Sequence, residues 1–249
     1  MKKLVMIVAA LFAACSCQLN IFGKIEIGNG VSVQNSYDLP AFSSISSLGA
    51  LDIYYTQSPE QSVVLTCDEN LVEFYIIESQ NGVLSVRVRP GVSITPATKS
   101  YLTVTSPVVQ YISVAGSGDC VIENDLEVAG DFEYKVTGSG DLNALGCISC
   151  EKFSAAVYGS GDIDVNSVRA ELAKFSLYGS GNIESKAVTA DNINVSISGS
   201  GGCDLNCEDA GDVEIRITGS GSVRLFGTAR SVNSKVTGSG RVQDRTSKR

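Results

Sequence analysis

The tripeptide Gly-Ser-Gly recurs at an almost constant interval from residue 116 to the end of this chain. The seven copies begin at Gly116, Gly138, Gly159, Gly179, Gly199, Gly219 and Gly238, at spacings of 22, 21, 20, 20, 20 and 19 residues. A fixed period of about 20 residues is typical of a solenoid, in which each repeat forms one coil and the stacked coils bury a continuous core.

Apolar and polar residues alternate before each tripeptide. The position two residues before the first glycine is always aliphatic, namely Val114, Val136, Val157, Leu177, Ile197, Ile217 and Val236. The position four residues before it is mostly apolar, namely Ile112, Tyr134, Ala155, Phe175, Val195, Ile215 and Ser234. The residues between these positions are mostly polar. This period of two predicts a strand with one buried and one solvated face.

A second alternating segment follows each tripeptide, and a third, weaker one surrounds Leu126, Ile148, Val168 and Val188. The first apolar positions of the second segment are Cys120, Leu142, Ile163, Ile183, Cys203, Val223 and Val242. Strands that recur once per coil predict an all-β, single-stranded parallel β-helix, with each strand paired to its equivalent about 4.8 Å along the axis. Glycine suits the corner because it reaches positive φ and permits close approach. A β-sandwich does not keep a 20-residue period, and a propeller needs about 40 residues per blade.

The first third of the chain lacks the tripeptide but keeps the alternation. Strands are predicted at residues 24–27, 51–55, 62–66 and 83–88, a short helix capped by Asp68 after the third of them, and an exposed loop at residues 90–98. We therefore predict one β-helix domain over residues 18–249. Its irregular leading coils, residues 18–113, would close the open end of the solenoid, and its repeat coils would span residues 114–249.

Residues 1–17 have the organisation of a targeting segment. Lys2 and Lys3 precede an apolar stretch that is too short to span a membrane as a helix. The following Cys15-Ser16-Cys17 resembles the lipobox of bacterial lipoproteins, because small residues precede the cysteine. Cys15, which follows two alanines, is the favoured lipidation site; acylation at Cys17 and signal cleavage without a lipid are the alternatives.

Charge and composition exclude several functions. Without the targeting segment the chain carries 17 basic and 27 acidic residues, which argues against nucleic acid as a partner. There is no histidine, so Ser-His-Asp and Cys-His catalysis and His-ligated zinc are excluded. We expect no catalytic residue set, no cofactor and no bound metal.

Several motifs occur in order along both the irregular and the repeated part. These are Gly28-Asn29-Gly30, residues 39–45 (LPAFSSI), residues 51–57 (LDIYYTQ), residues 67–71 (CDENL) and residues 114–119 (VAGSGD). Together they resemble the head GIN domain of auto-transporter adhesins, a family common in Bacteroidetes lipoproteins. The resemblance covers roughly residues 28–245. It implies a right-handed parallel β-helix, an envelope location and an adhesive role, and it supplies no catalytic residues.

Aspartates follow three successive corners, at Asp119, Asp141 and Asp162. Stacked carboxylates suit calcium binding or the acid–base chemistry of β-helical polysaccharide-cleaving enzymes, for which Lys135 or Arg169 would be the basic partner. The favoured interpretation is that these are turn aspartates bonded to nearby backbone.

The cysteines are predicted to be mostly structural. Cys120 and Cys203 share a column with leucine and isoleucine, so we expect unpaired core residues. Only Cys147 and Cys150 are close enough in the coil to form a local disulfide, which stays an alternative.

Tyr158 and Tyr178 share an outward position in consecutive coils and are the candidate ligand-binding residues, because exposed aromatic rings can form a platform for sugar rings. The sequence thus predicts a non-enzymatic lipoprotein held in the outer membrane by its lipid, on the surface or the periplasmic side. It would bind a glycan or an envelope protein along a lateral face. The alternatives are a pectinase-like β-helix enzyme and a structural or lipid-binding periplasmic protein.

Overall fold

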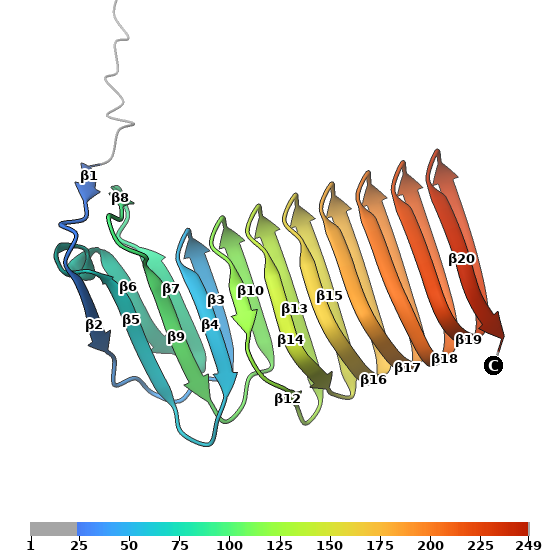
Figure 1. Ribbon diagram of the computed structural model, residues 1–249, viewed down its shortest axis with the longest axis horizontal. Helices are drawn as coiled ribbons and strands as arrows, with labels where there is room; N and C mark the ends of the chain where they lie inside the picture. The colour runs from blue at the N-terminus through green and yellow to red at the C-terminus, as the bar shows by residue number, and fades with distance from the viewer. Residues whose placement is uncertain (1–23, 249) are drawn as a thin grey trace, which may run out of the picture.

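The computed structural model describes residues 24–248 and builds them almost entirely from β-strands (Figure 1). The predicted targeting segment, with Cys15 and Cys17, lies outside the described residues. The elements are β1 (Lys24–Ile27), β2 (Ser32–Ser36), β3 (Ser44–Gly49), β4 (Asp52–Gln57), β5 (Ser62–Asp68), the 3₁₀-helix η1 (Glu69–Phe74), β6 (Tyr75–Gln80), β7 (Val83–Val88), β8 (Val92–Thr95), β9 (Tyr101–Ser106), β10 (Tyr111–Gly116), β11 (Cys120–Ile122), β12 (Leu126–Glu127), β13 (Asp131–Gly138), β14 (Leu142–Ser149), β15 (Lys152–Gly159), β16 (Ile163–Gly179), β17 (Asn182–Gly199), β18 (Gly202–Gly219), β19 (Ser222–Gly238) and β20 (Arg241–Lys248).

The chain winds into a parallel β-solenoid of about seven turns, which confirms the predicted fold. Each strand that leads into a corner pairs in parallel with its equivalent in the next coil, in the order β10, β13, β15, β16. From β16 onward each strand runs through almost the whole coil, so β16 to β19 stack as successive rungs (Figure 1).

The predicted apolar columns line up rung over rung. Val157 registers with Leu177 and Leu177 with Ile197, and all three side chains are at most 2% exposed. Burying an aliphatic side chain of this size contributes about 1.5–3 kcal/mol relative to leaving it in water. The third segment stacks too, since Val168 registers with both Ile148 and Val188. These columns form one continuous core along the axis.

Each Gly-Ser-Gly forms the corner between two strands, as predicted. Gly159 has a φ of +146°, and a Cβ built there would lie 2.3 Å from the carbonyl oxygen of Gly138 in the coil below. Only glycine meets both conditions, so the corner residues set how closely the coils stack.

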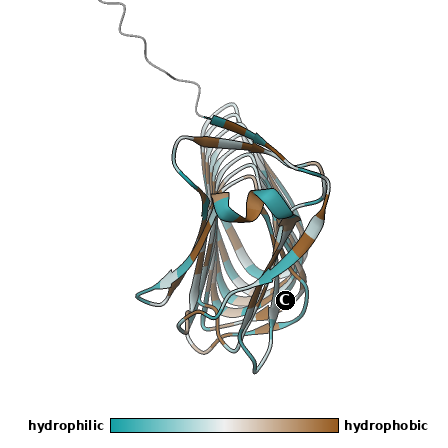
Figure 2. Ribbon diagram, turned by 90° about the vertical axis from the view of Figure 1, so that its left-hand side faces the viewer, coloured by the Kyte–Doolittle hydropathy of each residue, from teal (hydrophilic) through white to brown (hydrophobic). Residues whose placement is uncertain are grey.

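The N-terminal end is closed by a cap with a different topology. Strands β3 and β4 form the first coil, between β10 and β11 on one side and β7 and β9 on the other. The chain leaves this coil to build the cap and then returns to start β10. Within the cap β5 pairs antiparallel with β2 and β9. Figure 2 shows η1 crossing the open end of the solenoid, where its Leu71 and Phe74 are buried.

Two predictions for this region need correction. Asp68 precedes η1 as predicted, but its side chain makes no capping hydrogen bond to the helix. It instead accepts hydrogen bonds from the backbone N–H groups of Gly30, Ala97 and Thr98. The segment predicted as a loop at residues 90–98 contains β8, which pairs in parallel with β1. Among residues 24–248, no helix has the length and apolar character needed to cross a membrane.

Candidate functional site

Tyr158 and Tyr178 stand at the same outward position of β15 and β16, directly before the first glycine of each corner. Their side chains are 42% and 45% exposed. The ring centroids are 4.9 Å apart and the ring planes differ by 7°. Two rings lying side by side in one plane would clash at this centroid distance, so the two parallel rings are stacked face against face. The structure thus brings the two predicted ligand-binding residues together as one tyrosine stack.

The tyrosine stack is closed at one end and open at the other. On the closed side, the Lys135 ammonium lies over the Tyr158 ring, 5.1 Å from its centroid. Tyr158 therefore has a cation on one face and Tyr178 on the other. On the open side, the register partner of Tyr178 is Ser198, and the column continues with Thr218. These side chains are too short to cover a ring, so the second face of Tyr178 is exposed.

The burial of neighbouring residues follows the tyrosine stack. Ala156 and Ser176 point outward two residues before the tyrosines, yet each is only 6% exposed. In the next two coils the equivalent residues are Ser196, which is half-buried, and Arg216, which is exposed. The outward surface beside the two tyrosines is thus less exposed than the same surface in the next two coils.

The corner aspartates form a ladder of side chain to backbone hydrogen bonds. The Asp119 carboxylate accepts from the N–H of Asp141 at 2.9 Å, and the Asp141 carboxylate accepts from the N–H of Asp162 at 2.8 Å. The ladder begins with the Asp52 carboxylate, which accepts from the N–H of Asp119, and ends where the N–H of Asn182 donates to the Asp162 carboxylate. Each aspartate carboxylate thus accepts a hydrogen bond from the backbone of the next coil. The sequence favoured a bond to backbone, but to backbone nearby in the chain. Within residues 24–248, no group of three or more His, Cys, Asp or Glu side chains is placed to hold a metal ion.

The end of the ladder has a structural reason. In the later coils the N–H groups of Gly202, Ser222 and Arg241 donate to the backbone carbonyls of Gly181, Gly201 and Gly221. A backbone acceptor replaces the carboxylate there, so aspartate is no longer needed.

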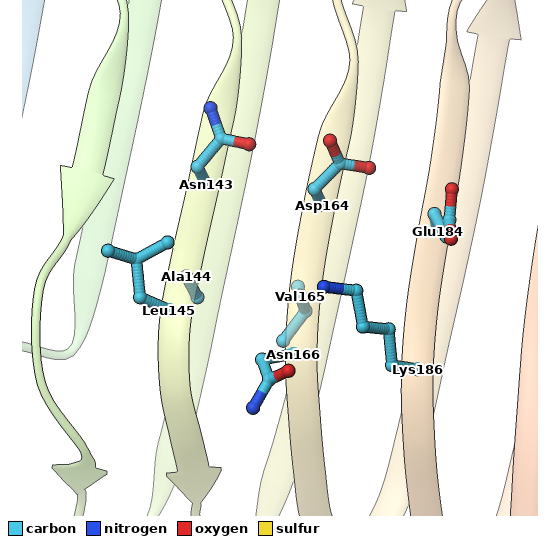
Figure 3. Close-up of a pocket in the computed structure, with 8 residues that line it drawn as sticks. All are labelled: Asn143, Ala144, Leu145, Asp164, Val165, Asn166, Glu184 and Lys186. Carbon is cyan, nitrogen blue, oxygen red and sulfur yellow. The ribbon is translucent and has the colours of Figure 1, made fainter.

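A shallow groove of about 220 Å³ lies on a second outward face, beside the aspartate ladder (Figure 3). Asn143, Asp164 and Glu184 are in register along it, and the Lys186 side chain reaches from β17 toward β16. Burial raises the pKa of Asp164, and the nearby carboxylates of Glu184, Asp162 and Asp141 raise it further, while Lys186 opposes them. The groove is open and mixed in character, since Ala144, Leu145 and Val165 line it together with the hydrogen-bonding side chains.

The basic residues considered from the sequence are not part of this groove. Lys135 covers Tyr158, and Arg169 registers with Ser149 and Thr189 on another segment of the coil. The cation that does line the groove, Lys186, was missed. Counting outward positions after the corner would have found it, since it lies two residues after Glu184 on the same face.

All six cysteines among residues 24–248 are free thiols. Cys120 and Cys203 are at most 1% exposed and register with Leu142 and Val223, which confirms that they are core residues. Burial raises the pKa of both the Cys120 and the Cys150 thiol to about 12. Cys147 and Cys150 are half-buried and carry no disulfide.

Comparison with known families confirms the family resemblance that the sequence motifs indicated. The family model described as "Putative auto-transporter adhesin, head GIN domain" matches residues 41–229 and 170–247. This chain belongs to the head GIN domain family. The match includes both the cap and the repeat coils. No curated protein matches the chain.

Solved structures share the fold of this head GIN domain. A "putative lipid binding protein" from Parabacteroides distasonis has a TM-score of 0.75 at 22% identity, covering 89% of this chain and 99% of the other. A "putative adhesin" from Bacteroides fragilis has a TM-score of 0.75 at 21% identity, covering 88% and 99%. A "putative adhesin" from Parabacteroides merdae has a TM-score of 0.66 at 22% identity, covering 89% and 99%.

These identities support a shared fold and no more. The family and these neighbours are named for adhesion or lipid binding, not for catalysis. Membership of the head GIN domain family is consistent with a binding role and with association with the cell envelope.

Proposed function

We propose that this protein is a non-enzymatic, lipid-anchored adhesin of the cell envelope that binds a glycan along one lateral face of its β-helix. A stiff solenoid suits this role because its rungs repeat every 4.8 Å or so, and an extended polymer can follow them. Buried side chains fill the interior, where Phe132, Phe153 and Phe175 follow one another ring against ring and are at most 1% exposed.

The observation that carries this proposal is the tyrosine stack. An aromatic face carries negative charge density, so it attracts the weakly positive C–H groups on the flat side of a sugar ring. Both rings are exposed on the lateral face that leads into the corners, and small or hydroxyl-bearing residues continue their column. Aromatic surface next to free hydroxyls suits a sugar, which presents apolar and hydroxyl groups together.

The membrane anchor is a second part of the proposal. Acylation of Cys15 would place the capped end near the membrane, because residue 24 enters the solenoid at the cap (Figure 1). Metabolic labelling with a palmitate analogue should be lost in Cys15→Ser and kept in Cys17→Ser. Protease treatment of intact cells then distinguishes the surface from the periplasmic side.

Binding to a panel of oligosaccharides and polysaccharides tests the adhesin proposal. The mature protein should bind a member of the panel without releasing new reducing ends, and Tyr158→Ala/Tyr178→Ala should abolish the binding. Phe226→Ala is the matched control, because that ring lies on the other face and is covered by Arg245. New reducing ends would favour an enzyme instead. A mature protein that binds no glycan but copurifies with lipid would favour the lipid-binding alternative, to which the name of one structural neighbour points.

A further inference from the structure

We propose that the open face of Tyr178, above Ser198, receives a single pyranose ring of the glycan as the next member of the tyrosine stack. This inference rests on the proposed function and defines where and how the sugar sits. It assigns different roles to the two tyrosines: Tyr178 contacts the ligand, and Tyr158 supports Tyr178 from behind.

The orientation of the rings leads to this assignment. Stacked rings 4.9 Å apart, on residues that are register partners, turn their faces along the solenoid axis. A sugar therefore cannot lie flat across both rings. One face of the Tyr158 ring lies against Tyr178, and the Lys135 ammonium lies over the ring from the coil below. The remaining face is that of Tyr178, on the side of Ser198.

The space beside Tyr178 fits one ring. Ser198 and Thr218 occupy the next two rungs of the same column, so Tyr178 and Thr218 are separated by roughly 9.6 Å, which is twice the strand spacing. A ring stacked at a contact distance of about 3.5–4.0 Å from Tyr178 lies above Ser198 and short of Thr218. A second stacked ring would meet the Thr218 side chain.

The rim of this space carries hydroxyl groups. Ser198 and Thr218 are exposed and Ser196 is half-buried, and none of the three side chains makes a hydrogen bond within residues 24–248. A pyranose stacked on Tyr178 directs its own hydroxyls outward around the ring edge, where such groups can donate and accept. An aromatic side chain of a protein ligand would use the ring face but gain no hydrogen bond from these hydroxyls, so the rim favours a sugar.

A pair of lysine substitutions on the two sides of the tyrosine stack tests the inference. Ser198→Lys places a long cation over the open face, much as Lys135 covers Tyr158. Thr137→Lys makes the same change on the closed side, because Thr137 is the register partner of Tyr158 there. Both positions are exposed and in one column, so the variants match in charge, chain length and distance from the core.

The probes are gluco-, manno-, galacto- and xylo-oligosaccharides with the mature protein, observed by proton NMR titration. In the complex the C–H protons of one sugar unit should shift upfield through the Tyr178 ring current. We expect Ser198→Lys and Tyr178→Ala to weaken binding at least about tenfold, and Thr137→Lys to stay within about twofold of wild type. Tyr158→Ala should give an intermediate loss, because it removes support but no ligand contact. Circular dichroism confirms that each variant is folded.

The outcomes separate this inference from the proposed function. If an oligosaccharide binds and the Ser198→Lys variant binds it as well as the Thr137→Lys variant does, the sugar lies elsewhere. The position above Ser198 is then refuted, and the proposed glycan-binding function is not. If none of the oligosaccharides binds, the inference and the proposed glycan ligand fail together. If free tyrosine or an aromatic peptide binds to the Tyr178 face and the sugars do not, the ligand is an aromatic side chain and the proposed sugar ligand is wrong.

Discussion

At the scale of single residues, the two glycines of each corner are required for different reasons. The first needs positive φ, as Gly159 shows, and the second needs the absence of a side chain. At Gly161 a built Cβ lies 2.1 Å from the carbonyl oxygen of Gly140, which is backbone and cannot move aside alone. Both glycines are therefore required by the close stacking of the coils, which is why the tripeptide predicts a corner from the sequence alone.

Gly161→Ala should destabilise the protein by at least about 2 kcal/mol, because the two coils must separate locally to admit the methyl group. Thermal unfolding should show a fall in Tm of several degrees. Gly202→Ala is the control, since the nearest atom to a Cβ there is the Asn182 side-chain oxygen at 3.0 Å, which can rotate away. Equal losses in both variants would show that glycine matters only for chain flexibility.

At the scale of elements, the repeat coils and the cap differ in how far the sequence predicts them. Columns such as Val157, Leu177 and Ile197 are separated by one period, so register follows from counting. The first corner was missed because Gly49 is followed by Ala50 and Leu51, although Gly49 registers with Gly116. The cap contacts of Asp68 join segments 29 to 38 residues apart with no period, and no local pattern encodes them.

The candidate site divides in the same way. The shared outward position of Tyr158 and Tyr178 follows from the period, so the pairing of the two rings could be predicted. The direction of their faces and the cover supplied by Lys135 depend on side-chain rotamers, which alternation does not specify.

The aspartate ladder gives an element-scale prediction. Asp141→Ala removes the acceptor of the Asp162 N–H and should cost about 1–2 kcal/mol, whereas Asp141→Asn keeps a carbonyl oxygen and should unfold close to wild type. Urea denaturation of the three proteins measures this difference. Adding Ca²⁺ should leave the wild-type midpoint unchanged; a clear increase would mean that the stacked carboxylates bind the ion.

The cap should make stability depend on pH through Asp68. Burial alone raises the pKa of this carboxyl, but the hydrogen bonds from the backbone N–H groups of Thr98, Ala97 and Gly30 outweigh it and hold the pKa below its ordinary value. A lowered folded-state pKa stabilises the protein above the unfolded-state value, and this stability is lost as pH falls through the folded-state value. Asp68→Asn should therefore lower Tm at pH 7, and the gap to wild type should narrow under strongly acidic conditions. A gap that stays constant with pH would show that the carboxylate charge is not involved.

At the scale of the whole molecule, the two ends of the solenoid are protected in different ways. The cap closes the N-terminal end with η1 and antiparallel strands (Figure 2). Within residues 24–248 no strand pairs with the outer edge of β20, and the inward columns there become polar. Asp244 registers with the buried Leu225, and Ser234 with Ile215. The last residues are also predominantly basic, in contrast to the acidic chain as a whole: Arg224, Arg230, Lys235, Arg241, Arg245, Lys248 and Arg249 accompany the one acid Asp244.

An inward charge and like charges at an open sheet edge oppose pairing with a second copy. Asp244→Leu should remove the first of these protections by extending the apolar column of Leu205 and Leu225 to the exposed end. Light scattering after size exclusion should then show concentration-dependent association. Added salt should strengthen it, because screening weakens the repulsion between the basic ends. Gln243→Leu adds the same side chain on the outward face, as the partner of Arg224, and should leave the elution unchanged. Association of both variants alike would mean that surface hydrophobicity, and not the end of the core, controls self-assembly.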